Sequence, residues 1–194
     1  MPSTSSFNAP GQALHARHPG KLLTLALMLS ALSPLCHAID SASLELGGGA
    51  KTQLLRVALQ SNWQAKWFES NGSALSGYWD ADIASLRGNQ HRNVKGAHQS
   101  VTDIGFTPVF RWQQNSKQGF YAEGGIGVHF LSGLWDNDGN QLSTHFQFGD
   151  HVGVGYVFAN KLDLGLKLQH FSNGGYKKPN TGINYVVVKA GFAF

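Results

Sequence analysis

Nearly the whole chain after residue 38 alternates between apolar and other side chains with a period of two. The clearest run begins at Leu162, where Leu-Asp-Leu-Gly-Leu-Lys-Leu leads into Gln-His-Phe-Ser-Asn. A β-strand sends successive side chains to opposite faces, whereas a helix repeats every 3.6 residues. The period therefore predicts an all-β fold. It also places His170 and Ser172 on the apolar face of their strand, although both are polar.

Eight alternating segments follow one another, separated by clusters of Gly, Asn, Asp and Ser. The strands are predicted over residues 42–49, 53–69, 73–87, 100–114, 119–131, 144–158, 161–172 and 183–194. One face of these strands carries large apolar and aromatic side chains. The other face combines glycine with acidic and basic side chains that nearly cancel in charge.

The distribution of apolar and charged residues between the two faces distinguishes a transmembrane barrel from a soluble one. Small side chains and opposed charges can fill a narrow barrel, while large apolar side chains suit lipid. The chain also stops at Phe194, as outer-membrane barrels commonly end on an aromatic residue. We therefore predict that residues 39–194 form an eight-stranded antiparallel transmembrane β-barrel with a polar, side-chain-filled interior, in the outer membrane. The alternative is a soluble lipocalin-like calyx, which would bury the charged face.

The first 38 residues have the pattern of an export signal. A basic stretch ending at Lys21 precedes an apolar run over residues 22–32, and Cys36 and Ala38 suit a cleavage site. Residues 1–38 are predicted to be a cleaved signal peptide. The alternative is a retained anchor helix, but the run is shorter than the roughly 20 residues that span a bilayer. Cleavage removes Cys36, which is the only cysteine, so no intramolecular disulfide is expected.

Strand count predicts the side of the membrane on which His170 and Ser172 lie. If both barrel termini are periplasmic, the segment 161–172 runs outward and ends at the cell surface. The two side chains then face the outer leaflet, where lipopolysaccharide lies. The basic residues are scattered along the chain, so nucleic acid is not an expected partner.

Side chains at positions i and i+2 of a strand share a face about 6.5–7 Å apart. His170 could therefore take the proton of Ser172 as that serine attacks an ester carbonyl. Backbone N–H groups at Asn173 and Gly174 could stabilise the oxyanion. Lys177 and Lys178 could contact phosphates. For His170 and Ser172, the alternative is that both are polar residues at the membrane interface. For Lys177 and Lys178, the alternative is an ordinary solvated loop.

The run His-Phe-Ser-Asn-Gly-Gly-Tyr-Lys-Lys-Pro-Asn-Thr-Gly-Ile, residues 170–183, resembles the signature of the outer-membrane lipid A 3-O-deacylase (PagL-type) family. The resemblance implies an eight-stranded barrel that hydrolyses the ester-linked acyl chain at position 3 of lipid A. It implies His170 and Ser172 as triad members, an oxyanion role for Asn173, and no metal or other cofactor. The expected partners are lipid A or lipopolysaccharide as substrate, the outer membrane, and a second copy in a homodimer.

This chain departs from the family pattern at the third triad position, which is Asn184 where the family has Glu. Alternate residues of a strand share a face, which we call their parity. By parity, Asn184 lies with Val186 and Val188 on the lipid face. An amide oxygen can orient the imidazole of His170, but it cannot neutralise an imidazolium. Asp150 has the same outward parity on the preceding strand and is a candidate substitute for the acid. The alternative is a β-bulge that turns Asp150 inward, or a position at the interface.

Asn184 also leaves open a rival class of function. The chain could be a structural or adhesive outer-membrane barrel, or a family member without activity. Residues 47–52 resemble a phosphate-binding loop but lack its required glycines and its following helix. His129, His145 and His151 have inward parity, for which buried polar packing is the preferred interpretation and a metal site is not predicted.

Overall fold

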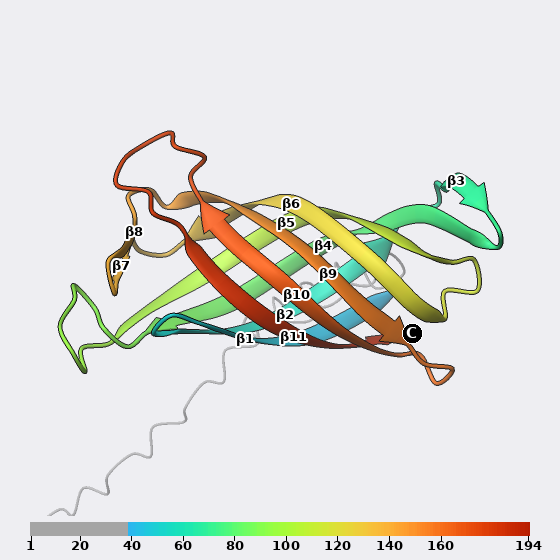
Figure 1. The fold of residues 1–194 in the computed structure, drawn as a ribbon, viewed down its shortest axis with the longest axis horizontal. Coiled ribbons are helices and arrows are strands. Elements are labelled where there is room, and N and C mark those ends of the chain that lie inside the picture. The colour runs from blue at the N-terminus through green and yellow to red at the C-terminus, as the bar shows by residue number, and fades with distance from the viewer. Residues whose placement is uncertain (1–38) are drawn as a thin grey trace, which may run out of the picture. The chain divides into compact units, whose positions relative to one another are not determined.

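Antiparallel strands joined by turns and loops make up the described part of the chain, residues 39–194, in this computed structural model (Figure 1). The signal peptide predicted over residues 1–38 lies outside the described residues. Within residues 39–194, no helix is long and apolar enough to cross a membrane.

Eight long strands close into a barrel. They are β1 (Ser41–Gly49), β2 (Thr52–Asn62), β4 (Ser73–Gly88), β5 (Gln99–Gln114), β6 (Gly119–Leu131), β9 (Phe146–Val157), β10 (Leu162–Ser172) and β11 (Ile183–Ala193). Each strand pairs antiparallel with the next of the eight, and β1 also pairs with β11. A closed wall satisfies its own backbone hydrogen bonds, as lipid requires. The predicted eight-stranded antiparallel barrel is confirmed.

The second predicted strand, residues 53–69, differs most in extent from the structure. The strand β2 ends at Asn62, and β3 (Trp67–Ser70) pairs with β4 outside the barrel wall. At the break, the Trp63 N–H donates to the Gly77 carbonyl at 2.9 Å. The Trp63 ring packs edge-on against Phe110 at 4.9 Å, and a Cβ at Gly77 would lie only 2.4 Å from that ring. An aromatic side chain packed over a glycine therefore ends the strand, which an alternating pattern does not reveal.

A small hairpin covers the barrel end that carries the longer loops. It consists of β7 (Trp135–Asn137) and β8 (Asn140–Leu142), within the connection from β6 to β9. Its two turn residues, Asp138 and Gly139, have φ of 52° and 75°, as a two-residue hairpin turn needs. Trp135 is 1% exposed and belongs to an apolar cluster that fills this end of the interior.

The middle of the interior is ionic. Glu45 and Arg56 approach to 3.1 Å and are 0% and 3% exposed. Nearer the other end, Arg111 and Glu123 approach to 2.6 Å. These side chains are paired across strands, which is how buried charges are tolerated. The polar, side-chain-filled interior is thus as predicted.

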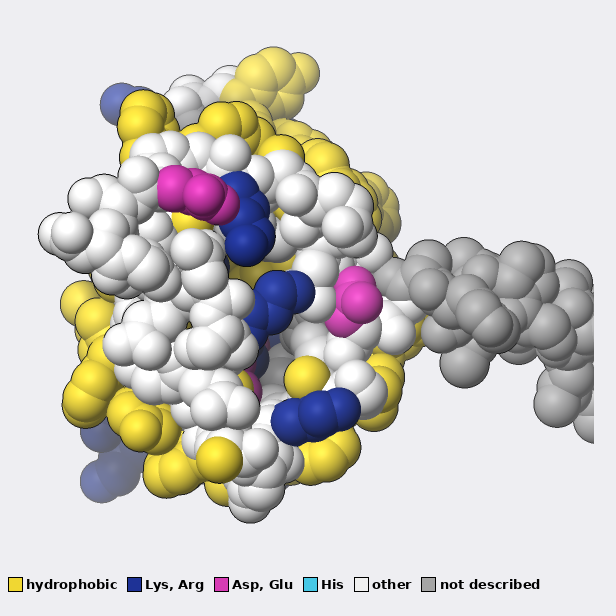
Figure 2. Space-filling model, turned by 90° about the vertical axis from the view of Figure 1, so that its right-hand side faces the viewer, with side chains coloured by type: hydrophobic (Ala, Val, Ile, Leu, Met, Phe, Trp, Pro, Cys, Tyr) yellow, Lys and Arg dark blue, Asp and Glu magenta, His cyan; other side chains and the backbone are white. Residues whose placement is uncertain are grey.

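Apolar side chains cover the outer wall. Leu164, Leu166 and Leu168 of β10 are 42–59% exposed, whereas the intervening Lys167 is 4% exposed. Figure 2 shows the end of the barrel near β3, where Lys, Arg, Asp and Glu side chains lie in and around the mouth and apolar side chains gather on the outside. The Phe194 end of the chain lies at this end, opposite the loop that follows β10 (Figure 1).

Candidate active site

His170 and Ser172 lie at the end of β10 and point to the apolar outer face. The side chains that alternate with them, Gln169 and Phe171, are 3% and 0% exposed and point into the barrel. His170 and Ser172 themselves are half-buried. The parity of the strand therefore places both polar side chains on the lipid-facing wall, as the alternation predicted.

His170 lies between two side chains of neighbouring strands. Its register partner on β11 is Asn184, and its register partner on β9 is Asp150. Asn184 Oδ1 lies 2.7 Å from His170 Nδ1. Because an amide oxygen only accepts, this contact requires the hydrogen on Nδ1 and leaves the Nε2 lone pair available as a base.

Gly182 fixes the other side of the imidazole. Its φ is +77°, and a Cβ there would lie 2.4 Å from His170 Cε1 and 3.2 Å from Nε2. The backbone at Gly182 therefore packs directly against the ring edge that carries the base nitrogen. The sequence prediction did not single out this residue. A glycine just before the start of β11 was its only sequence signal.

The loop between β10 and β11, residues 173–182, is held by Asn173, which is 1% exposed. The Asn173 N–H donates to Asn180 Oδ1 at 3.0 Å, and Nδ2 donates to the Lys177 carbonyl at 2.6 Å. Its Oδ1 accepts from the Gly175 N–H at 3.0 Å. The donors of Asn173 are thus engaged within the loop. Among the described residues, the hydrogen bonds of this loop leave the Gly174 N–H without a partner.

Lys177 and Lys178 are exposed in the same loop, beyond the strand ends. Their ammonium groups can reach a charged group at the membrane surface. The carbonyl of Lys177 also accepts from Ser143 Oγ at 2.8 Å, which ties this loop to the connection that carries β7 and β8.

A groove of about 530 Å³ runs along the outer wall beside His170. This is within the size range of small-ligand sites, roughly 300–1,000 Å³. Apolar and glycine residues of four strands and one turn line it next to His170 and Asn184: Gly48, Gly49, Ala50, Val152, Leu168 and Val186. The shape and lining of this groove suit a hydrocarbon chain laid against the wall.

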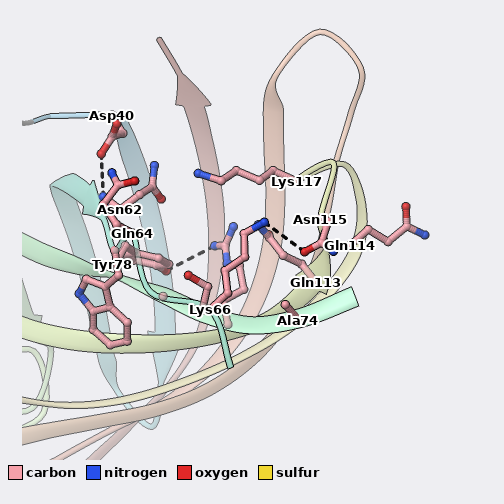
Figure 3. Close-up of a pocket in the computed structure, with 14 residues that line it drawn as sticks. Asp40, Asn62, Gln64, Lys66, Ala74, Tyr78, Gln113, Gln114, Asn115 and Lys117 are labelled. Atoms are coloured by element: carbon pink, nitrogen blue, oxygen red, sulfur yellow. Dashed lines mark hydrogen bonds between the residues drawn. The ribbon is translucent and has the colours of Figure 1, made fainter. Parts of the chain in front are cut away.

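A second cavity, of about 180 Å³, lies at the opposite end of the barrel (Figure 3). It is polar: Lys66 donates to Asn115 Oδ1 at 3.3 Å, and Asp40 accepts from the Asn62 N–H at 2.6 Å. Neither His170 nor the loop after β10 borders it. The groups suited to ester hydrolysis are therefore on the wall and not in this mouth.

The three histidines with predicted inward parity do not behave alike. His129 and His151 are buried inside the barrel. His145 is exposed instead, because β9 begins one residue later, at Phe146. Its Nδ1 lies 2.7 Å from the Leu131 carbonyl, and its ring stacks on Phe130 at 5.6 Å. The inward assignment of His145 was wrong because the chain before β9 does not follow the strand period.

Comparisons with known proteins find a matching family model and two similar relatives. A family model described as lipid A 3-O-deacylase (PagL) matches residues 53–193. A lipid A deacylase PagL of Pseudomonas aeruginosa is 32% identical over 167 residues, which cover 84% of this chain and 92% of the relative. A lipid A deacylase PagL of Bordetella bronchiseptica is 38% identical over 117 residues, which cover 60% of this chain and 58% of the relative.

Solved structures show the same fold. The crystal structure of the outer membrane enzyme PagL matches with a TM-score of 0.68 and 26% identity, covering 79% of this chain and 99% of that one. Neisserial surface protein A (NspA) matches with a TM-score of 0.52 and 12% identity over 80% of this chain and 94% of that one, a likeness of fold alone.

The closed wall with its apolar outer face defines an outer-membrane β-barrel, and the relatives named lipid A deacylase make it an enzyme of the ester-hydrolase class. Within that class, the chain belongs to the lipid A 3-O-deacylase (PagL) family.

Proposed function

We propose that this protein hydrolyses the ester-linked 3-hydroxyacyl chain at position 3 of lipid A in the outer leaflet, by a serine-hydrolase mechanism. The observation that carries the proposal is the 2.7 Å contact between His170 and Asn184 on the lipid-facing wall, two residues from Ser172 on the same face. Polar groups exposed to hydrocarbon are costly, so the hydrogen-bonded pair of His170 and Asn184 on this face supports a role in chemistry.

Ser172 is the proposed nucleophile and His170 the proposed base. His170 Nε2 takes the Ser172 Oγ hydrogen while Oγ bonds to the ester carbonyl carbon, and the carbonyl oxygen becomes an oxyanion. When the tetrahedral intermediate collapses, the bond to the sugar 3-oxygen breaks and that oxygen takes the proton from His170. Water, activated by the same Nε2, then cleaves the acyl-serine, which releases the 3-hydroxy fatty acid and restores Ser172.

Asn173 and Gly174 are the proposed source of oxyanion stabilisation. Because the donors of Asn173 have partners in the loop, we assign the direct donation to the Gly174 N–H and the shaping of the loop to Asn173. A backbone donor that is already in place costs no reorganisation when the charge develops. No cofactor takes part in this scheme.

Asn184 is the proposed orienting member of the triad, and Asp150 the proposed source of negative charge. Asn184 holds the tautomer in which Nε2 is basic. Directly cross-strand residues have Cβ atoms about 4.5–5.5 Å apart, so the Asp150 carboxylate lies within Coulombic reach of the imidazolium. In other triads a single carboxylate both orients the imidazole and stabilises the imidazolium. Here Asn184 has the first role and Asp150 the second.

The substrate is proposed to approach sideways through the membrane. Its acyl chain fits the groove between β9, β10, β11 and the turn after β1, and its phosphates lie near Lys177 or Lys178 in the surface loop. With the acyl chain in the groove and the phosphates near the loop, the ester that joins the acyl chain to the sugar lies at the end of β10, beside His170 and Ser172.

Asn184 also favours a second candidate, a family member or structural barrel without activity. Mass spectrometry of lipid A from cells that express wild-type protein, Ser172→Ala or Ser85→Ala separates the two. Ser85 is an exposed serine on β4, so its loss controls for removal of a wall hydroxyl. We expect one 3-hydroxyacyl chain to be lost with wild type and Ser85→Ala only. Identical lipid A from all three strains, at equal amounts of folded barrel, would refute the proposal.

A further inference from the structure

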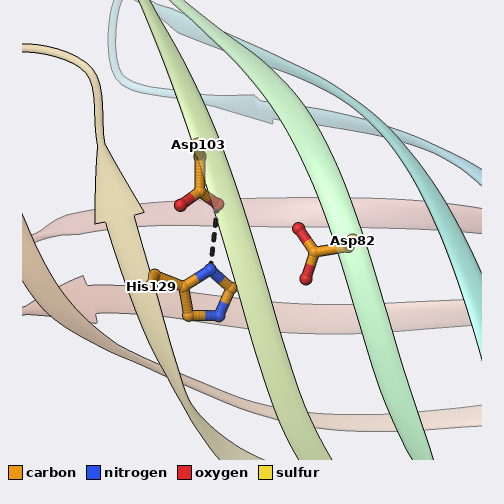
Figure 4. Close-up of side chains that lie close together, drawn as sticks. All are labelled: Asp82, Asp103 and His129. Carbon is orange, nitrogen blue, oxygen red and sulfur yellow. Dashed lines mark hydrogen bonds and ion pairs between the residues drawn. The ribbon is translucent and has the colours of Figure 1, made fainter.

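Three buried side chains with metal-binding chemistry converge inside the barrel, from three neighbouring strands of its wall. Asp82 of β4, Asp103 of β5 and His129 of β6 each offer a ligand atom, and these atoms lie within 4.8 Å of one another (Figure 4). The exposed fractions of the three residues are 7%, 0% and 3%. His129 Nδ1 and Asp103 Oδ2 approach to 2.9 Å.

The backbone is shaped to allow this approach. Gly105 faces two of the three side chains, because a Cβ there would be 2.4 Å from Asp82 Oδ2 and 2.5 Å from His129 Nδ1. Any other residue at position 105 would occupy the space at which the side chains point. The glycine therefore keeps open the volume into which Asp82 Oδ2 and His129 Nδ1 project.

Two carboxylate oxygens of this cluster lack hydrogen-bond partners. Asp103 Oδ1 is buried without one among the described residues, and the same holds for Asp82 Oδ1. Asp82 Oδ1 lies 3.2 Å from Arg56 Nε, an ionic contact whose geometry is not that of a hydrogen bond. An unsatisfied buried carboxylate oxygen is costly, so each such atom needs an explanation.

The charge of the interior is unbalanced in the same region. Near the β3 end, two acids and two bases pair with each other: Glu123 and Asp163 with Arg111 and Lys189. In the middle, when each charge is counted once, Arg56 and Lys167 are the cations among the described residues that remain to offset the four buried carboxyl groups of Glu45, Asp80, Asp82 and Asp103. If all are ionised and His129 is neutral, the middle of the barrel carries an excess of two negative charges.

We propose that Asp82, Asp103 and His129 bind one divalent first-row metal ion, of which Zn²⁺ is the best match. One imidazole and two carboxylates are ligands that Zn²⁺ accepts, at about 2.0–2.2 Å from each. A doubly charged cation cancels the excess charge. It replaces the hydrogen between His129 Nδ1 and Asp103 Oδ2, which is released as a proton, and it binds the two carboxylates whose Oδ1 atoms have no hydrogen-bond partner. Thr107 Oγ1, 3.5 Å from His129 Nε2, orients the far side of the imidazole as an outer hydrogen-bond partner.

The ion would have a structural role behind the active site. The His129 ring packs edge-on against Phe171, with 5.0 Å between centroids. Phe171 is the residue between His170 and Ser172, so fixing His129 also fixes the β10 segment that presents them. This link to catalysis rests on the proposed function, whereas binding of the ion does not.

The test is metal content and stability of untagged barrel, refolded into detergent micelles with Zn²⁺ or with chelator and then desalted. His151→Gln is the matched control, since His151 is also a buried histidine but lies outside the cluster. We expect about one tightly held Zn²⁺ per chain in wild type and His151→Gln, and less than a tenth of that in Asp103→Asn and His129→Gln. Zinc should raise the apparent melting temperature of wild type by several degrees and leave Asp103→Asn unchanged.

Equal zinc in wild type and Asp103→Asn would mean adventitious binding at surface histidines and would overturn the proposal. So would a metal-free wild type whose stability ignores zinc, in which case two protons neutralise the cluster instead. If the cluster variants fail to fold, the comparison of wild type refolded with zinc and with chelator still decides. Because these readouts use no substrate, their failure is separate from a failure of the proposed esterase activity.

Discussion

The division of labour around His170 gives the sharpest prediction. Asn184 Oδ1 accepts from Nδ1, and Asp150 is the register partner of His170 on the neighbouring strand β9. At an effective dielectric constant of about 20, a carboxylate about 6 Å from the imidazolium is worth about 3 kcal/mol. Because both groups lie near the strand end, where water at the membrane surface screens the interaction, about 1.4–2.7 kcal/mol is expected, or roughly 10–100-fold in rate.

Removing the charge alone should therefore slow the chemical step. Asp150→Asn is expected to lower kcat about 10–100-fold, with little change in KM, because the imidazolium forms only during the reaction. Asn184→Asp keeps the length of the side chain and adds a carboxylate at the existing 2.7 Å contact. In the wild-type background it should change kcat by less than about 5-fold, because a charge is already present.

The double variant Asp150→Asn/Asn184→Asp tests directly whether Asp150 supplies the negative charge. Asn184→Asp in the Asp150→Asn background should restore most of the lost rate, since either carboxylate can stabilise the same imidazolium. The assay is release of 3-hydroxy fatty acid from purified lipid A in mixed micelles, with Ser85→Ala as the control. The reasoning is refuted if Asp150→Asn has wild-type kcat while Asn184→Asp alone raises kcat 100-fold, because Asp150 would then supply no charge.

Three further perturbations follow from the site. Gly182→Ala places a Cβ 2.4 Å from His170 Cε1, so activity should fall at least about 100-fold while the heat-modifiable folded band on gels persists; unchanged activity would mean that the ring does not rest on this backbone. Asn173→Ala removes the Nδ2 donation to the Lys177 carbonyl, so the loop 174–181 should become sensitive to limited proteolysis and kcat should drop, and an equally protected loop would count against the scaffold role. Lys177→Ala combined with Lys178→Ala should raise KM about 3–10-fold for lipid A with its phosphates but not for dephosphorylated lipid A; an equal effect on both substrates would remove the phosphate assignment.

Alternation in the sequence was enough to predict the barrel, the polar interior and the outward placement of His170, Ser172 and Asn184. These predictions depend only on which residues share a face of a strand, and that assignment does not change when a strand end is misplaced by a residue or two. It failed at Trp63 and His145, where packing over Gly77 and a later strand start replace the regular period.

Contacts between strands were beyond the sequence alone. The approach of Asp82, Asp103 and His129 depends on the registers of β4, β5 and β6, which no single strand encodes. The same is true of Gly182, whose importance appears only when its backbone is seen against the His170 ring. The engaged donors of Asn173 likewise follow from how the loop folds back on itself.

The most direct test of the central claim is covalent trapping of the nucleophile. Barrel in lipid micelles is treated with a serine-directed phosphonate ester that carries a long acyl chain, and the modified residue is mapped by peptide mass spectrometry. The account predicts modification at Ser172 in wild type and Ser85→Ala, slowed by added lipid A and abolished in His170→Gln. Labelling of another residue, or labelling of Ser172→Ala or His170→Gln at the wild-type level, would contradict it.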